Sequence, residues 1–258
     1  MSIAIEEKKS EGMCTISIFD PGMSGRIPMI ILVHNFAGSK ENMIEYGYEF
    51  AKEGFFAVTF DLYNHRDLSA SDKKKEFDFF NLPPDETLKI LTESTSFINR
   101  VIEIYQSNQK IMSNKIGLVG FSFGGCVVYN YLAGNRIPGI KSAVSILGSP
   151  NIINFINKLF VQSGRHMYLG ENELEILSEI QPSHNMHELK DFPLLMINNM
   201  DDEIVPIQDI RKSHEELFFN YTNQDLLRLI EFRAGGHRIK PVMMDEVILW
   251  FKKFLNAH

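Results

Sequence analysis

The chain has 258 residues, of which 44% are hydrophobic and 23% are charged, and its formal net charge is −7. This composition is typical of a globular protein and excludes wholesale disorder. The excess of acidic residues argues against a nucleic-acid partner, because phosphate binding needs a concentrated basic surface.

Two further features indicate the compartment. The only cysteines, Cys14 and Cys126, form neither a disulfide framework nor a zinc-ligand spacing, as expected in a reducing environment. The first residues, MSIAIEEKKSEGM, carry charges where a secretory signal would have its apolar segment. No run approaches the roughly 18 apolar residues of a membrane-spanning helix. We therefore expect a cytoplasmic protein without stable membrane insertion.

Apolar runs typical of strands alternate along the chain with segments of helical periodicity. The expected strands cover residues 14–19, 27–35, 55–62, 115–121, 140–147, 192–199 and 226–232, and the expected helices cover 41–54, 86–105, 124–133, 207–220 and 242–255. This alternation predicts an α/β fold, with a mostly parallel, twisted sheet and helices on both faces.

Two stretches depart from simple strand–helix units. Residues 68–85 are polar at first and then aromatic. Residues 151–190 are longer than a crossover requires and contain two helical pieces, IINFINKLF and ELEILSEI. We interpret residues 151–190 as a small helical cap over the carboxyl ends of the strands, inserted in a single domain that spans residues 1–258.

The stretch GLVGFSFGG places Ser122 between a strand and a helix, with Gly120 and Gly124 on either side. A nucleophile elbow needs small residues at both flanking positions, because strand and helix come close together there. A tight joint without catalytic purpose would also need small residues. The position at the carboxyl end of a strand favours the nucleophile, since reactive groups of open α/β sheets gather there.

A serine hydroxyl needs a base to become nucleophilic, and the imidazole of that base needs a carboxylate partner. His237 follows the last expected strand in a glycine-rich loop. Asp201, Asp202 and Glu203 follow the strand before it. The three acids also allow a cation site, which their spacing makes the weaker interpretation. For a developing oxyanion, we expect the backbone amides of Phe123 and Phe36 to donate.

These motifs together resemble the α/β-hydrolase superfamily, in particular the serine esterases of its dienelactone-hydrolase and prolyl-oligopeptidase-like branch. The resemblance covers residues 27–258 and rests on LVHNFAGSKENM, FDLYNHRD, GLVGFSFGG, LLMINNMDDEIVP and AGGHR. It implies the α/β-hydrolase fold and a catalytic triad of Ser122, Asp202 and His237, in the family's chain order.

The sequence departs from the family pattern at three points. Asn35 replaces the first glycine of the usual His-Gly-x-x-Gly loop, and Arg66 follows His65 where a glycine is usual. The dienelactone enzymes proper use a cysteine nucleophile, whereas this chain has Ser122. We therefore expect His65 and Asp61 to be structural.

The implied function is hydrolysis of carboxylic esters of small or medium acyl or aryl substrates, without a cofactor or metal. Thioester, peptide and lipid ester cleavage by the same residues remain alternatives, as does a binding protein that has kept the fold. Aromatic side chains are candidates for substrate contact, although they could equally be core of the cap: Phe36, Phe155, Phe160 and Tyr168. Trp250 is expected on an ordinary helix face, with a homodimer contact as the alternative.

Overall fold

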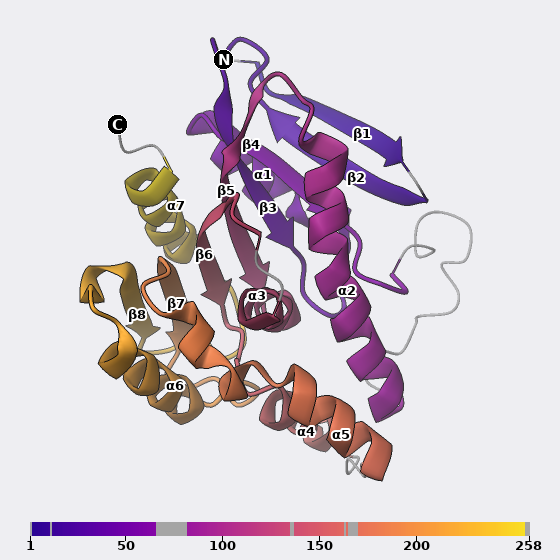
Figure 1. Cartoon of the computed structure of the whole chain (residues 1–258), viewed down its shortest axis with the longest axis vertical. Helices are drawn as coiled ribbons and strands as arrows, with labels where there is room; N and C mark the ends of the chain where they lie inside the picture. Colours follow the sequence, from indigo (N-terminus) through magenta and orange to yellow (C-terminus); the bar gives the residue numbers. More distant parts are fainter. Residues whose placement is uncertain are drawn as a thin grey trace.

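The computed structural model describes residues 2–10, 12–65, 82–134, 137–162, 164 and 170–255. Its centre is one eight-stranded sheet with the strand order β1-β2-β4-β3-β5-β6-β7-β8 (Figure 1). The strands are β1 (Ala4–Ser10), β2 (Met13–Phe19), β3 (Ile27–Val33), β4 (Phe56–Phe60), β5 (Ile111–Phe121), β6 (Ile140–Ile146), β7 (Leu194–Asn199) and β8 (Leu227–Phe232). The seven strands expected from the sequence are all present, and β1 is additional.

The strands β3 to β8 pair in parallel, as predicted, whereas β2 pairs antiparallel with both β1 and β4. Every residue of β3, β4 and β7 is buried, which explains their unbroken apolar sequences. β1 was not predicted because its sequence, AIEEKKS, has no apolar alternation. Its residues are largely exposed at the edge of the sheet, where charged side chains discourage pairing with another chain.

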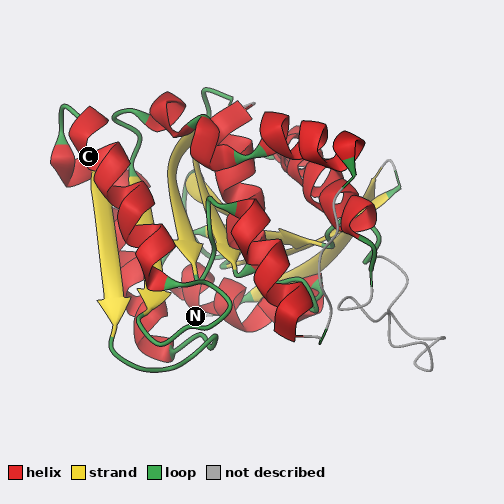
Figure 2. Cartoon of the chain, turned by 90° about the horizontal axis from the view of Figure 1, so that it is seen from below, coloured by secondary structure: helices red, strands yellow, loops and turns green. Residues whose placement is uncertain are grey.

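Helices cover both faces of the sheet (Figure 2). The core on one face includes side chains of α1 and α7, and the core on the other includes side chains of α2, α3, α4 and α6. The bounds of these helices are α1 (Ile44–Lys52), α2 (Pro84–Tyr105), α3 (Phe123–Gly134), α4 (Ile152–Gln162), α6 (Ile207–Asn220) and α7 (Pro241–Leu255). Trp250 of α7 is 4% exposed and packs in the core of its face.

The long connection from β6 to β7 contains α4, α5 (Glu171–Ile180) and two short 3-10 helices, η3 (Pro182–His184) and η4 (Met186–Leu189). The two predicted helical pieces are therefore confirmed. In Figure 1, α4 and α5 lie on the side toward which the strands β3, β5 and β6 point. The Gln181 side chain ties the connection together, because it accepts from the Ile152 amide and donates to Asn151. Its role as a cap stays a prediction.

The register of the sheet brings several strand ends to one edge. Val33 of β3 pairs with Gly120 of β5, and Phe121 of β5 pairs with Ile146 of β6. Further along the same edge, at the last two strands of the sheet, Asn199 of β7 pairs with Phe232 of β8. The residues that follow β3, β5, β7 and β8 therefore leave the sheet on the same side, which is where open α/β sheets hold their reactive groups.

A buried histidine joins the ends of β3 and β4. The ring of His34 is fully buried, its Nε2 accepts from the Leu62 amide at 3.0 Å, and its Nδ1 donates to the Asn35 carbonyl at 2.7 Å. Both contacts fit the neutral ring. Burial, together with the neighbouring His65, lowers the pKa of His34 to about 3.

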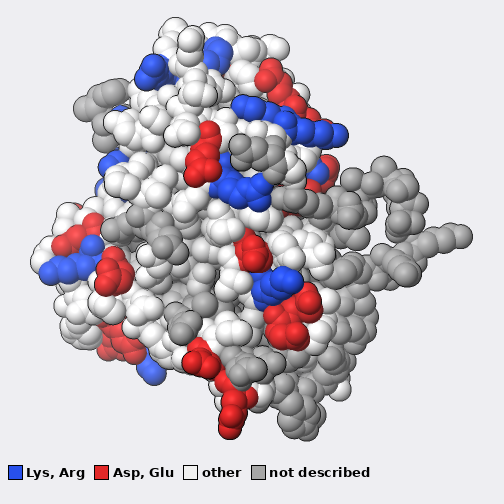
Figure 3. Space-filling view, turned by 45° about the vertical axis from the view of Figure 1, so that its right-hand side comes forward, with Lys and Arg blue, Asp and Glu red and all other residues white. Residues whose placement is uncertain are grey.

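The surface carries charges of both signs. On the face shown in Figure 3, Lys and Arg side chains are interspersed with Asp and Glu side chains. Among the helices that the structure describes, none combines the length and apolar character that crossing a bilayer requires.

We expect His34 to make the protein sensitive to acid. In the unfolded chain its pKa returns to about 6.5, so the unfolded state binds more protons than the folded state as the pH falls below that value. Between pH 7 and pH 5 this removes about 2 kcal/mol from the free energy of unfolding, at about 1.4 kcal/mol per pH unit. Urea unfolding of the wild type and of His34→Gln at both pH values measures the effect. The free energy of unfolding of the wild type should exceed that of His34→Gln by about 2 kcal/mol less at pH 5 than at pH 7. An equal difference at both pH values would contradict the assignment of the acid sensitivity to His34.

Candidate active site

Ser122 occupies a sharp turn between β5 and α3. Its φ is +54°, a left-handed conformation that costs an ordinary residue roughly 1–2 kcal/mol. The Ser122 amide donates to the Ile146 carbonyl at 2.8 Å, and the Ser122 carbonyl accepts from the Gly125 amide at 2.8 Å. These bonds hold the strained residue between the sheet and the first turn of the helix. Strain of this kind is typical of a functional position.

The glycines around Ser122 are required by close packing of backbone on backbone. A Cβ at position 124 would lie 2.6 Å from the carbonyl oxygen of His34 and closer still to that of Val33. A Cβ at position 120 would lie 2.6 Å from the Gly125 amide nitrogen. Because each obstacle is backbone, no side-chain movement could relieve these collisions. The spacing of glycines that suggested an elbow in the sequence thus has a steric cause.

His237 meets the serine hydroxyl from the loop that follows β8. Its Nε2 lies 2.6 Å from Ser122 Oγ, although the two residues are 115 positions apart in the chain. The loop reaches this place through Gly235 and Gly236, whose φ angles of +150° and +55° suit glycine. The His237 side chain is 20% exposed, so solvent reaches the ring.

Asp202 completes the hydrogen-bonded row from the turn after β7. Its Oδ2 lies 2.7 Å from His237 Nδ1, and its side chain is fully buried. Its Oδ1 accepts from the backbone amides of Ile204 and Val205, each at 2.9 Å. A carboxylate can only accept, so His237 Nδ1 carries a proton. Nε2 is then free to accept the proton of the Ser122 hydroxyl.

The structure selects one of the three acids that follow β7. Only Asp202 contacts the imidazole, whereas Asp201 accepts from the amides of Gly235 and Gly236 at 3.0 and 2.9 Å. Sequence reasoning gave Asp201 no role, and it also missed Asn199, whose buried amide contacts the same loop. Polar residues at the end of an apolar strand, as in LLMINNMDD, were the available signal.

The two expected oxyanion donors lie near each other. Phe123 is the first residue of α3, so its amide has no acceptor within the helix. The rings of Phe36 and Phe123 are 4.7 Å apart between centroids. The Phe36 carbonyl accepts from His65 Nε2 at 2.6 Å, and His65 Nδ1 lies 2.9 Å from the Tyr63 carbonyl. His65 therefore braces the loop, and the oxyanion role of both amides stays a prediction.

Asp61 supports the same loop from the end of β4. Its two carboxylate oxygens accept from the Lys40 amide at 2.9 Å and from the Lys40 ammonium at 2.7 Å. Burial disfavours the charged ammonium, but its hydrogen bonds to Asp61 and Glu41 outweigh this and raise the pKa of Lys40. The expectation that Asp61 and His65 are structural agrees with these contacts.

The aromatic residues proposed for substrate contact are largely covered by protein. Phe155 and Phe160 are 1% and 5% exposed, both belong to the core that includes α3, and the Phe155 ring lies 6.1 Å from that of Phe123. This burial favours the alternative, in which Phe155 and Phe160 are core, and their contact with substrate stays a prediction. Phe36 is 7% exposed and retains its place beside the elbow. Tyr168 lies outside the described residues.

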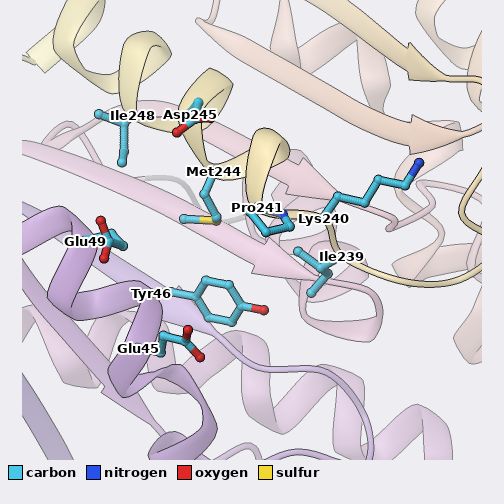
Figure 4. A pocket seen from close by; sticks show the side chains of 9 residues that line it. All are labelled: Glu45, Tyr46, Glu49, Ile239, Lys240, Pro241, Met244, Asp245 and Ile248. Carbon is cyan, nitrogen blue, oxygen red and sulfur yellow. The ribbon is translucent and has the colours of Figure 1, made fainter.

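Two other features lie near the elbow without entering it. Cys126 is fully buried in α3, and burial raises the pKa of its thiol to about 12, which leaves the thiol un-ionised and inert. A surface pocket lies between α1 and the start of α7, and in Figure 4 the Lys240 ammonium points away from Tyr46. The residues that line this pocket are Glu45, Tyr46, Glu49, Ile239, Lys240, Pro241, Met244, Asp245 and Ile248. The pocket is therefore distinct from the row of Ser122, His237 and Asp202.

Comparisons with known proteins find a matching family and several relatives of the chain. A model of the dienelactone hydrolase family matches residues 16–227, a range that includes Ser122 and Asp202 and ends before the loop of His237. The chain is 26% identical over 243 residues to the "Putative esterase YitV" of Bacillus subtilis, covering 89% of this chain and 90% of the relative. It is 21% identical over 259 residues to "Esterase YjfP" of Escherichia coli, covering 98% and 100%.

A solved structure shows the fold. The protein TT1662 of Thermus thermophilus matches this structure with a TM-score of 0.76 and 20% sequence identity, and the match covers 100% of both chains. The predicted architecture, a mostly parallel sheet of the α/β-hydrolase type with helices on both faces, is thereby confirmed, and the sheet has one strand more than the seven expected.

We expect Gly124→Ala to disrupt the elbow, because the new methyl group would collide with the carbonyl oxygens of Val33 and His34. The free energy of unfolding should fall by roughly 3 kcal/mol or more. Gly134→Ala is the matched control, since it lies at the other end of α3 and nothing is within 4 Å of its new Cβ. It should change stability by at most about 1 kcal/mol. Urea unfolding followed by circular dichroism compares the two variants, and equal effects would contradict the packing argument.

Proposed function

The chain belongs to the dienelactone hydrolase family, and on that premise we propose that it is a serine hydrolase that cleaves carboxylic esters through an acyl-enzyme on Ser122. The observation that carries the proposal is the hydrogen-bonded row from Ser122 Oγ through His237 to Asp202, with distances of 2.6 and 2.7 Å. The names of the relatives, which are esterases, support an ester as the bond that is cleaved.

In the first half of the reaction, His237 Nε2 takes the proton of the Ser122 hydroxyl as Oγ attacks the ester carbonyl carbon. The imidazole becomes positively charged, and the buried Asp202 carboxylate stabilises that charge through the bond to Nδ1. The tetrahedral intermediate then collapses. The bond to the alkoxy group breaks, His237 returns the proton to the departing alcohol, and the acyl group remains on Ser122.

In the second half, a water molecule takes the place of the alcohol. His237 accepts a proton from this water while the water oxygen attacks the acyl carbon. The bond between the acyl carbon and Ser122 Oγ then breaks, the proton returns from His237 to Oγ, and the carboxylic acid leaves. The 20% exposure of the His237 side chain is consistent with access of water to this base.

The negative oxygen of each intermediate requires donors. We assign this task to the amides of Phe123 and Phe36, which on this proposal flank the carbonyl oxygen of the substrate. The partial positive charge at the start of α3 favours an anion at the same place. His65, Asp61 and Lys40 fix the loop of Phe36, so that its amide is held before substrate binds.

The proposal differs from the chemistry of a cysteine hydrolase. Position 122 is serine, and the nearest thiol in sequence, Cys126, is buried and un-ionised. A thiolate nucleophile from Cys126 would require the thiol to leave the core of α3. The reaction that these residues support is therefore acyl transfer to an alcohol oxygen.

Replacement of the nucleophile is the direct test. We expect Ser122→Ala to lower kcat for p-nitrophenyl acetate by at least roughly 10⁴-fold and to abolish labelling by a fluorophosphonate probe. Cys126→Ala, four positions further along, is the matched control and should retain both activities, because its thiol takes no part. Hydrolysis by a folded Ser122→Ala protein at the wild-type rate would refute the proposal.

The acid has a separate signature. In Asp202→Asn the side chain has nearly the same shape, but its amide can donate to Nδ1 and thus stabilise the tautomer that presents a proton to Ser122. We expect kcat to fall by roughly 10³- to 10⁴-fold at neutral pH while KM changes little. Asp201→Asn is the comparison at the neighbouring carboxylate, and we expect it to lower kcat far less than Asp202→Asn does. Steady-state kinetics on the same ester measures both, and equal losses would argue against Asp202 as the partner of His237.

A further inference from the structure

The loop that carries His237 is held by the residues directly before the proposed acid. β7 ends at Asn199, and the turn after it presents Asp201 and Asp202. Each of these three side chains makes hydrogen bonds to residues 235–238. Only the contact of Asp202 belongs to the proton path. The other two side chains contact backbone alone.

Asn199 bridges the backbone carbonyls of the two residues on either side of the histidine. Its Nδ2 donates to the Gly236 carbonyl at 2.7 Å and to the Arg238 carbonyl at 3.1 Å. The whole residue is buried, with 0% exposure. Within the described part of the chain, its Oδ1 is buried without a hydrogen-bond partner. Asn198 Oδ1 is buried in the same way, so what distinguishes Asn199 is its pair of hydrogen bonds to the histidine loop.

Asp201 holds the same loop as a hydrogen-bond acceptor, whereas Asn199 acts as a donor. Its two carboxylate oxygens accept from the amides of Gly235 and Gly236. These two amides favour the ionised carboxylate and lower the pKa of Asp201 below its ordinary value. Hydrogen bonds donated by Asn199 and accepted by Asp201 thus hold the backbone on both sides of His237, while its ring faces Ser122 and Asp202.

The loop needs this support because of its own composition. Gly235 and Gly236 adopt positive φ angles, and glycine has more backbone freedom to lose than any other residue. The imidazole must satisfy two distances at once, 2.6 Å to Ser122 and 2.7 Å to Asp202. A displacement of about 1 Å in a reacting group costs on the order of 100-fold in rate. A loop with two glycines would not hold that position without external contacts.

We propose that Asn199 and Asp201 are positioning residues that clamp the backbone on both sides of His237 and thereby set the geometry of the imidazole. The clamp acts through His237 and touches no substrate. This inference rests on the proposed function, because positioning has a catalytic effect only if His237 is the base.

The test replaces Asn199 and compares it with a neighbour. Asn199→Leu keeps the number and branching of the side-chain heavy atoms and removes both hydrogen-bond donors. Asn198→Leu is the matched control, because Asn198 is also fully buried on β7 but its amide faces the Gly148 carbonyl at 3.4 Å, away from the loop. We expect Asn199→Leu to lower kcat for p-nitrophenyl acetate and the rate of fluorophosphonate labelling by about 100-fold, with KM little changed. Asn198→Leu should retain the wild-type kcat.

Two further measurements separate positioning from stability. Asp201 is exposed, so Asp201→Ala tests the other half of the clamp without a change in the core, and we expect about a 10-fold loss in kcat. The proton between His237 Nδ1 and Asp202 should give a downfield NMR signal in the wild type and in Asn198→Leu. That signal should broaden or vanish in Asn199→Leu.

The outcomes distinguish the clamp from the function. If the wild type reacts with the probe but folded Asn199→Leu and Asp201→Ala react equally fast, the clamp is refuted and the proposed function stands. If the wild type does not react at all, the proposed function fails. The NMR signal then still decides the clamp, because an unchanged signal in Asn199→Leu would refute it without reference to activity.

Discussion

The close approach of α3 to β3 and β5 is the constraint on which the proposed site depends. Backbone atoms meet at Gly120 and Gly124 with no space for a methyl group, and the chain turns between them with a positive φ at Ser122. This packing fixes both the hydroxyl and the first amide of α3 relative to the sheet. Because the sheet also fixes the ends of β7 and β8, three side chains that are far apart in sequence can be held within hydrogen-bond distance.

The elements of the fold were predictable where burial leaves a periodic or continuous pattern. The parallel strands are buried on both faces and therefore have continuous apolar sequences. The amphipathic helices between them show apolar residues at helical spacing. β1 escaped prediction because an exposed edge strand has no apolar side to reveal it. The triad residues could be nominated from glycines and strand ends, but the choice of Asp202 over Asp201 depended on a family resemblance. Nothing in the local sequence of MDDEIVP distinguishes a carboxylate that meets an imidazole from one that meets two amides.

The residues that escaped the sequence analysis act on backbone. Asn199 and Asp201 contact carbonyls and amides of the loop, and such contacts leave no complementary residue type elsewhere in the sequence to suggest a partner. His65, which the sequence analysis expects to be structural, likewise contacts two carbonyls near the elbow, but the sequence did not indicate which ones. For Phe155 and Phe160 the sequence left two interpretations open, since aromatic residues in a long insertion suit a binding pocket and a core equally well. Their low exposure favours the core.

Among the four adjacent strands β5 to β8, β6 is the one that leads to no member of the hydrogen-bonded row. β6 lies between β5, which leads to the serine, and β7, which leads to the acid, so it acts as a spacer whose width is set by backbone pairing alone. The connection that leaves β6 supplies none of the three side chains either, but its helix α4 packs near the elbow, where the Phe155 ring lies 6.1 Å from that of Phe123. If this connection forms the cap that we predict, substitutions in it would alter substrate selectivity while the three hydrogen-bonded side chains keep their positions.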